Sequence, residues 1–290
     1  MASKTKCPKP AKCLKPAKCP KPAKCLDPAK CLKPAYCLDD NDVIEVGVDE
    51  AGRGPMLGRV YAGAVILPKD MERFNHALMK DSKKFTSEKK IKEVAAYIKA
   101  NAISWGVGYA DEAVIDKINI RNATHRAMHD AIQKALSNPK GAALSNPEGS
   151  ALSNPKGSAL SNPEGSALSN PEGSALSNPM SLGLTPTLLL VDGNDFTPFR
   201  LSDADADAIP HVCVEGGDNT FSAIAAASIL AKVSRDEYIA ELCATHPLLD
   251  ERYGLLKNKG YGTKKHMDGI KAHGISEFHR KSFGICREYA

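Results

Sequence analysis

Residues 43–67 read VIEVGVDEAGRGPMLGRVYAGAVIL, and this stretch decides the fold. Residues 43–48 alternate and are rich in β-branched side chains, and residues 60–67 form a second apolar run, so both are predicted to be strands. A glycine-rich turn joins them, and the acidic pair Asp49 and Glu50 follows the first strand. The stretch therefore predicts two neighbouring strands that present two carboxylates at one edge of a sheet.

Strand and helix patterns alternate along the rest of the chain. Strand patterns cover residues 103–109, 188–191 and 211–214, and helical patterns cover residues 86–100, 122–136 and 221–242. The last of these helices contains a run of small residues, 225–228, which would let it lie close to the sheet. We therefore expect an α/β fold in which a mixed sheet is flanked by helices.

Two tandem repeats interrupt this pattern. The first has a proline and a cysteine every six residues, and its cysteines are Cys7, Cys13, Cys19, Cys25, Cys31 and Cys37. Proline at this spacing blocks helix and sheet interiors alike, so residues 1–38 are expected to be a disordered tail. The second repeats an ALSNPEGS-like octapeptide without helical or strand periodicity, and residues 137–182 are expected to be a low-complexity insert. One folded domain is predicted over residues 39–290.

Charge is distributed unevenly between the tail and the rest of the chain. The net charge is +5, but residues 1–38 contain ten lysines and one acid, Asp27, so the tail carries +9 and the remainder −4. The charge of the folded part does not by itself indicate a nucleic-acid-binding patch. No apolar run approaches the ~20 residues of a membrane span, and no apolar signal-peptide stretch opens the sequence. We expect a soluble, cytoplasmic protein with free thiols.

Two further acids stand at comparable positions. Asp192 follows the strand at 188–191, and Asp218 follows a pair of glycines. A single carboxylate at a strand end is often only a cap or turn former, but the consecutive acids Asp49 and Glu50 repel each other unless a cation neutralises them. Oxygen-only ligands favour Mg²⁺ or Mn²⁺, and two such ions ~4 Å apart can hold both oxygens of a phosphodiester displacement. The acids therefore indicate phosphodiester hydrolysis.

Several longer motifs support this interpretation. They are GVDEAGRGPMLGRVYAGAVIL from Gly47, DSKKF from Asp81, LLLVDGND from Leu188, GGDNTFSAIAAASILAKVSRD from Gly216, KGYGTKKH from Lys259 and HRKSF from His279. By these motifs the chain resembles the ribonuclease HII family, also called type 2 ribonuclease H, over residues 43–283 apart from the insert. The resemblance implies a ribonuclease H-like core with a helical C-terminal region. The implied activity is cleavage 5′ of a ribonucleotide paired with DNA, leaving 3′-hydroxyl and 5′-phosphate ends.

The resemblance also implies roles for individual residues. Metal binding and catalysis fall on four acids, Asp49, Glu50, Asp192 and Asp218, with two Mg²⁺ or Mn²⁺ ions as the expected cofactors. The expected partners are RNA–DNA hybrids and duplex DNA with single embedded ribonucleotides, and the expected role is removal of such ribonucleotides. Residues 39–290 would then be the catalytic domain, and we expect a monomer.

Substrate recognition is expected at two further motifs. In the family, the segment that matches Gly52, Arg53 and Gly54 holds the backbone and 2′-hydroxyl at an RNA-to-DNA junction. The tyrosine that matches Tyr261 packs on the following deoxyribose and fits poorly against a 2′-hydroxyl. The alternative for residues 52–54 is a glycine turn without a binding role, and the alternative for Tyr261 is a tyrosine of the hydrophobic core.

The remaining polar residues are less specific. Four cationic side chains could each either contact a phosphate of the substrate or be a solvated surface charge. They are Lys83, Lys84, Lys232 and Arg235. Core or supporting roles are expected for His125, His129 and His266, and buried, unreactive thiols for Cys213, Cys243 and Cys286.

Two other functional classes compete with the nuclease interpretation. A nucleic-acid-binding protein without turnover is disfavoured because all four acids are present. A zinc-binding cysteine module in the tail is disfavoured because zinc sites use closely spaced cysteine pairs, whereas here five residues including proline separate each cysteine from the next.

Overall fold

The computed structural model describes residues 43–137, 188–202 and 207–290. The predicted tail, and the predicted insert apart from Ser137, lie outside the described residues. These described residues contain five strands: β1 (Glu45–Ala51), β2 (Val60–Ile66), β3 (Ser104–Ala110), β4 (Leu188–Asp192) and β5 (His211–Val214). Each of the five predicted strands is confirmed, with its ends shifted by up to three residues.

The strands form one mixed sheet in the order β3-β2-β1-β4-β5. β1 is antiparallel to β2 and parallel to β4, and β4 is parallel to β5. β1 is therefore the central strand, with hydrogen-bonded neighbours on both sides. Because β1 and β4 run in the same direction, their carboxyl ends lie at the same edge of the sheet.

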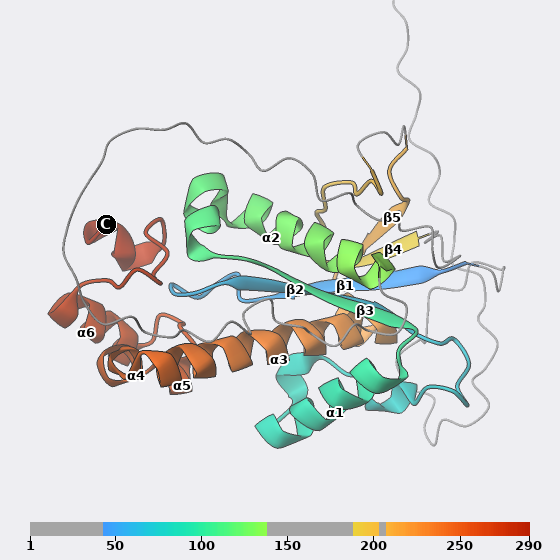
Figure 1. Ribbon diagram of the computed structural model, residues 1–290, viewed down its shortest axis with the longest axis horizontal. Helices are drawn as coiled ribbons and strands as arrows, with labels where there is room; N and C mark the ends of the chain where they lie inside the picture. The colour runs from blue at the N-terminus through green and yellow to red at the C-terminus, as the bar shows by residue number, and fades with distance from the viewer. Residues whose placement is uncertain (1–42, 138–187, 203–206) are drawn as a thin grey trace, which may run out of the picture.

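Helices cover both faces of this sheet, so the predicted α/β layers are confirmed (Figure 1). The helix α2 (Glu112–Ser137) lies on one face, and α1 (Glu88–Asn101) and α3 (Ser222–Thr245) lie on the other. Three shorter helices, α4 (Pro247–Tyr253), α5 (Leu255–Asn258) and α6 (Lys264–His273), form the helical C-terminal region beyond the end of α3. Short 3-10 turns are η1 (His76–Leu78), η2 (Ser82–Lys84), η4 (Gly217–Asn219) and η5 (Gly284–Glu288).

The helix α3 approaches the sheet closely because glycine faces it from two strands. A Cβ placed on Gly47 would lie 2.2 Å from the carbonyl carbon of Ala223, and one on Gly63 would lie 2.3 Å from the carbonyl oxygen of Ala227. Neither position can hold a side chain without moving the helix. The small residues 225–228 of the helix were predicted to allow close packing. The strands beneath the helix also carry glycine at the points of contact, Gly47 and Gly63.

The helix α2 differs from the predicted helix at 122–136 because it begins ten residues earlier. The side chain of Asp111 accepts a hydrogen bond from the backbone N–H of Val114 and caps the first turn. Asn119 then interrupts the helix with φ 67° and ψ 162°, and its side chain accepts a hydrogen bond from the backbone of Asn122. The sequence pattern identified only the second half, which restarts at this internal cap.

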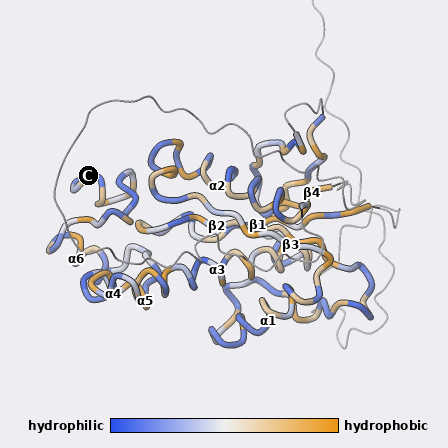
Figure 2. Tube along the Cα trace, in the orientation of Figure 1, coloured by the Kyte–Doolittle hydropathy of each residue, from blue (hydrophilic) through white to orange (hydrophobic). Residues whose placement is uncertain are grey.

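Apolar side chains fill the space on either side of the sheet. In Figure 2 hydrophobic residues concentrate along the strands, and hydrophilic residues dominate the loop that follows β2. Two of the cysteines, Cys243 and Cys286, are buried as predicted, but Cys213 on β5 is only partly buried, so that prediction was wrong. In the described part of the sheet, β5 is an edge strand with one hydrogen-bonded neighbour, β4. In the described part of the chain, no helix is long and apolar enough to span a bilayer.

Candidate active site

Two of the four acids are brought together by the parallel pairing of β1 and β4. The last paired residues of the two strands are Val48 and Val191, and Asp49 and Asp192 are the next residues on each strand. Glu50 follows Asp49 on β1. Gly47 restricts the position of β1, because a slip of one residue would place valine where a Cβ would lie 2.2 Å from the carbonyl carbon of Ala223.

The turn after β5 adds the fourth acid. The backbone N–H of Gly217 donates a hydrogen bond to Asp192 Oδ1 at 2.7 Å, so this turn is tied directly to the end of β4. Gly216 has a positive φ of 64°, which allows the chain to reverse here at little steric cost. Asp218 is buried and accepts a hydrogen bond at 2.8 Å from the side chain of Asn219. All four acids therefore lie where β1, β4 and the turn after β5 meet.

Burial and mutual repulsion both act on these carboxyl groups. Burial is the main reason that the pKa of Asp49 is raised well above its ordinary value, and the charges of Glu50 and Asp192 raise it further. The pKa of Glu50 is raised by burial and by Asp192, although Arg53 opposes the rise. Burial, Asp81 and Asp192 raise the pKa of Asp218. The acids thus share one electrostatic field that resists their simultaneous ionisation.

Cationic partners for these acids are few. Glu50 forms an ion pair with Arg53 at 3.2 Å, and within the described ranges no ion pair to Asp49, Asp192 or Asp218 is present. The donors are all carboxylate oxygens, which is the set that hard divalent cations prefer. Across the same described ranges, no group of three or more histidine, cysteine, aspartate or glutamate side chains is arranged closely enough to hold a metal ion. The chemistry of the donors fits such an ion, and binding would require the carboxylates to draw closer.

Serine residues line the base of the site. The hydroxyl of Ser228 on α3 hydrogen-bonds the carboxyl group of Asp49 and lowers its pKa, and the same hydroxyl lies 3.0 Å from that of Ser82. Sequence reasoning did not identify Ser228 or Ser82, although both belong to the quoted motifs. The 3-10 turn η2 also brings Lys84 to Asn219, with a hydrogen bond between their side chains, and Lys83 into the field of Asp218. Both lysines are exposed beside the acids.

The predicted recognition turn directly follows β1. Gly52 has φ 94°, and a Cβ on it would lie 2.3 Å from Nε of Arg235. The guanidinium of Arg53 is largely exposed, whereas its backbone carbonyl is bound by Arg280. Arg280 is fully buried, and it was missed by sequence reasoning.

Tyr261 lies beside this turn, although it is distant in sequence. Its ring is within 3.4 Å of the position that a Cβ on Gly54 would occupy. Tyr261 is 49% exposed, so the alternative of a core tyrosine is wrong. The guanidinium carbon of Arg235 lies 5.7 Å from the centre of its ring. The structure therefore brings together three predicted recognition elements, the turn 52–54, Tyr261 and Arg235.

Two of the predicted phosphate-binding residues are placed differently from Lys83 and Lys84. Arg235 is 3% exposed and donates a hydrogen bond at 2.6 Å to the carbonyl of Lys259, so it is not a solvated surface charge. Its place beneath Gly52 and Tyr261 favours a supporting role. Lys232 is partly exposed and forms an ion pair at 2.8 Å with Asp236.

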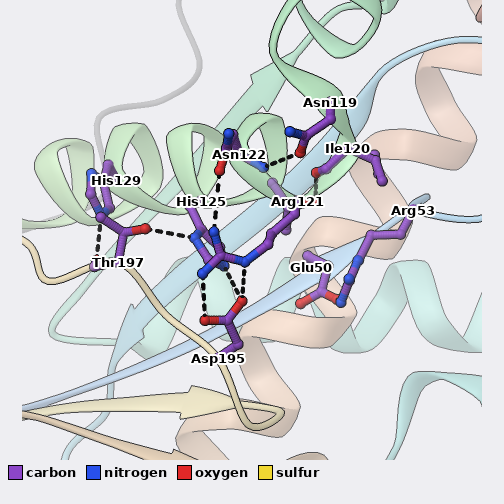
Figure 3. Close-up of polar contacts among 11 residues, drawn as sticks. Glu50, Arg53, Asn119, Ile120, Arg121, Asn122, His125, His129, Asp195 and Thr197 are labelled. Carbon is purple, nitrogen blue, oxygen red and sulfur yellow. Dashed lines mark hydrogen bonds and ion pairs between the residues drawn. The ribbon is translucent and has the colours of Figure 1, made fainter. Parts of the chain in front are cut away.

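A row of three side chains on α2 holds the loop that follows Asp192 (Figure 3). Arg121 pairs with Asp195, and His125 Nδ1 and His129 Nε2 each lie 2.8 Å from an oxygen of Thr197. His125 and His129 thus have the supporting role that the sequence suggested. Arg121 was missed, although the spacing of four residues between the three side chains places them on one face of a helix.

Known proteins resemble this chain in sequence. The family model for ribonuclease HII matches residues 46–148 and 179–286, and a model for a domain of unknown function, DUF4774, matches residues 132–186. Ribonuclease HII of Parabacteroides distasonis is 38% identical over 245 residues, covering 84% of this chain and 92% of that protein. Ribonuclease HII of Porphyromonas gingivalis is 36% identical over 244 residues, covering 84% of this chain and 90% of that protein.

Solved structures share the fold. Ribonuclease H2 from Pyrococcus horikoshii superposes with a TM-score of 0.53 at 19% identity, covering 84% of this chain and 96% of that one. Bst-RNase HIII in complex with Mn²⁺ gives a TM-score of 0.54 at 17% identity, covering 86% and 69%. The fold and the acidic sheet edge define a nuclease of the ribonuclease H class, which uses divalent metal. The chain belongs to the ribonuclease HII family, whose members are endonucleases that cleave RNA in RNA–DNA hybrids.

Proposed function

We propose that this enzyme hydrolyses the phosphodiester 5′ of a ribonucleotide, both in RNA–DNA hybrids and at single ribonucleotides embedded in duplex DNA. The observation that carries the proposal is the meeting of Asp49, Glu50, Asp192 and Asp218 at one sheet edge, where burial and repulsion raise the pKa of three of them. Such an arrangement disfavours ionised carboxylates unless a cation joins them. Their assigned role is to hold the ions and to fix them relative to the substrate.

The expected cofactors are Mg²⁺ or Mn²⁺, with two ions in the catalytic complex. When bound, these ions would supply Lewis acidity and neutralise charge on the phosphate. The residues themselves supply the selectivity for hard cations, because no nitrogen or sulfur ligand lies among the four acids. Ser228 would orient Asp49, and Gly217 would orient Asp192, through the hydrogen bonds described above.

Recognition of the ribonucleotide is assigned to the turn 52–54 and to Tyr261. Gly52, Arg53 and Gly54 would hold the backbone and the 2′-hydroxyl, since the glycines leave room for close approach. Tyr261 would pack on the following deoxyribose, and its exposed ring is available for this contact. The proximity of Gly54 to Tyr261 supports the proposal, because both must touch adjacent nucleotides.

Cationic residues around the site would position the strand without reading its sequence. Lys83 and Lys84 are exposed beside Asp218 and suit direct phosphate contact. Lys232 could do so only if it left Asp236. Arg235 is assigned to supporting the turn and Tyr261 from beneath.

The test is cleavage of a DNA duplex that contains one ribonucleotide, with an all-DNA duplex and an RNA–DNA hybrid as controls. We expect a cut 5′ of the ribonucleotide that requires Mg²⁺ or Mn²⁺ and is abolished by EDTA. Asp49→Asn should lower kcat by at least about 100-fold, because it removes one ligand charge and a transition-state interaction. Cleavage that survives EDTA or this substitution would contradict the assignment of the acids.

The biological role that follows is the removal of ribonucleotides from DNA. We further propose that the protein is a cytoplasmic monomer. Light scattering coupled to gel filtration tests the oligomeric state, and a mass of one chain is expected. A mass of two chains would contradict it.

A further inference from the structure

The turn 52–54 and Tyr261 together form what we call the recognition surface. Two consecutive buried residues, His279 and Arg280, are linked by hydrogen bonds to these two elements. Arg280 is fully buried and His279 is 1% exposed. Neither contacts the four acids through any hydrogen bond or ion pair of the described residues. Their contacts lead instead to the turn 52–58 on one side and to Tyr261 on the other.

Arg280 binds the turn through four carbonyl oxygens. Its Nε donates to Gly58 at 2.8 Å, its Nη1 to Arg53 at 3.0 Å and Pro55 at 2.8 Å, and its Nη2 to Gly52 at 2.7 Å. The planar guanidinium has a fixed fork of donors, so these bonds fix the relative positions of the carbonyls. Lysine has three donors on one freely rotating nitrogen and cannot reproduce this pattern. The backbone at Gly52 and Arg53 is thus set by Arg280.

His279 reaches Tyr261 through a second histidine. His279 Nε2 lies 3.1 Å from His266 Nε2, and His266 Nδ1 lies 3.0 Å from the carbonyl oxygen of Tyr261. At its other end, His279 Nδ1 is 2.9 Å from the backbone nitrogen of Ser276 and 2.8 Å from the hydroxyl oxygen of the same residue. These contacts form one continuous chain between Ser276 and Tyr261.

The protons in this chain can be assigned from its two ends. The Ser276 backbone N–H can only donate, so His279 Nδ1 accepts and the proton of the neutral ring lies on Nε2. That N–H donates to His266 Nε2, which leaves the His266 proton on Nδ1 to donate to the Tyr261 carbonyl. Burial and the neighbouring His266 lower the pKa of His279 to about 3, and burial lowers that of His266, which agrees with two neutral rings. The chain therefore has one direction and one pair of tautomers.

We propose that His279 and Arg280, together with His266, are positioning residues that hold Tyr261 and the turn 52–54 at the spacing needed to read an RNA-to-DNA junction. This inference rests on the proposed function of those two elements. A direct backbone bond from Met56 N–H to Gly260 carbonyl, at 2.9 Å, joins the same two segments next to the site of contact. The recognition surface thus consists of two chain segments, the turn 52–54 and the segment that contains Tyr261. His279 and Arg280 fix their relative positions.

The experiment compares two substitutions that divide the histidine chain. Asn places its amide near the Nδ1 position of His, and Gln places its amide near the Nε2 position. His279→Asn should keep the bond to Ser276 and lose the bond to His266, whereas His279→Gln should keep a donor for His266. Arg280→Lys tests the other branch. Tyr253→Phe is the matched control, because it removes a hydrogen bond of 3.0 Å to Gly274 in the same core and leaves both histidines in place.

The readout is the ratio of kcat/KM on a duplex with one ribonucleotide to kcat/KM on an RNA–DNA hybrid. His279→Asn and Arg280→Lys should lower this ratio by roughly fivefold, the effect of about one lost hydrogen bond, while hybrid cleavage changes little. His279→Gln and Tyr253→Phe should leave the ratio unchanged. Equal loss on both substrates in His279→Asn, or an unchanged ratio, would overturn the inference and leave the proposed function standing. If the wild-type enzyme does not cut 5′ of the single ribonucleotide, both this inference and the proposed function would be overturned.

Ring-nitrogen NMR of the wild-type protein provides a second measurement that does not depend on a variant folding. We expect His266 to carry its proton on Nδ1 and His279 on Nε2 between pH 5 and pH 8, a range roughly centred on the ordinary histidine pKa of about 6.5. The opposite tautomer at either ring would break the chain and overturn the inference.

Discussion

Asp49 is the residue whose surroundings conflict most with its charge. It lies at 4% exposure between the sheet and α3, next to Glu50 and Asp192, yet among the residues that the structure describes it receives hydrogen bonds only from uncharged groups. A carboxylate in such a place lowers the stability of the protein whenever it is ionised without a cation. Function and stability therefore make opposite demands on this side chain.

Asp49→Asn should stabilise the metal-free protein. Because the folded-state pKa of Asp49 is raised, the native state binds more protons than the unfolded state above the ordinary value of 3.8. Wild-type stability in EDTA should thus fall as pH rises from 3.8 through the raised pKa, and the variant should lack this part of the loss. Urea unfolding at neutral pH should favour the variant by on the order of 1 kcal/mol. Mg²⁺ should reduce this difference in the free energy of unfolding between variant and wild type. A difference that is equally large at acidic pH would contradict the explanation.

Gly52 and Gly54 should respond differently to alanine. Gly52→Ala places a Cβ 2.3 Å from buried Arg235 at a φ of 94°, and we expect it to cost roughly 2–4 kcal/mol of stability. At Gly54 the nearest atom, on Tyr261, is 3.4 Å away, so Gly54→Ala should change stability by less than about 0.5 kcal/mol and act on substrate binding instead. Thermal unfolding of the two variants with KM measurement provides the test. Equal destabilisation would refute the distinction.

At the scale of elements, the strands and most helices could be predicted from local patterns, because β-branched runs and helical spacing act within one segment. The edge that collects the acids followed from apolar strands that each end in a carboxylate. The positions of Arg280 and Ser228 could not be predicted in this way, because their partners lie far away in sequence. The break of α2 at Asn119 was missed for a local reason, since its positive φ is visible only in the folded backbone.

The row formed by Arg121, His125 and His129 joins α2 to the loop after β4. The insert lies between α2 and β4. Replacing residues 138–182 with a short glycine-serine linker should therefore leave kcat/KM within about twofold, because the insert joins the chain before Leu188, and this first residue of β4 is four residues from Asp192, or roughly 13 Å by strand rise. Cleavage of the single-ribonucleotide duplex is the measurement. A tenfold loss would show that the repeat contributes to the site.

At the scale of the whole molecule, charge is separated along the chain. The tail carries +9 and the remainder −4, so the folded part approaches a polyanionic substrate with local cations only. Lysines near a phosphate backbone displace counterions, and this makes affinity fall with salt. The tail is the largest single source of positive charge in the sequence.

Deletion of residues 1–38 should flatten the salt dependence of binding to duplex DNA. Each lost phosphate contact lowers the slope of log K against log salt by roughly 0.9, whereas kcat at saturating substrate should not change. Fluorescence anisotropy across a salt series measures the slope. A slope equal to that of the full chain would show that the tail does not touch DNA.

The contacts of Arg280 with the turn join residues 222 to 228 positions apart. A ribosome therefore makes residues 52–58 at least 222 residues before Arg280, whereas all four acids have been made by residue 218. During synthesis the four carboxylates are thus present before the recognition surface, the turn 52–54 with Tyr261, can form. The backbone contacts that set residues 52–58 can therefore form only after residue 280 has been made, later than the synthesis of all four acids.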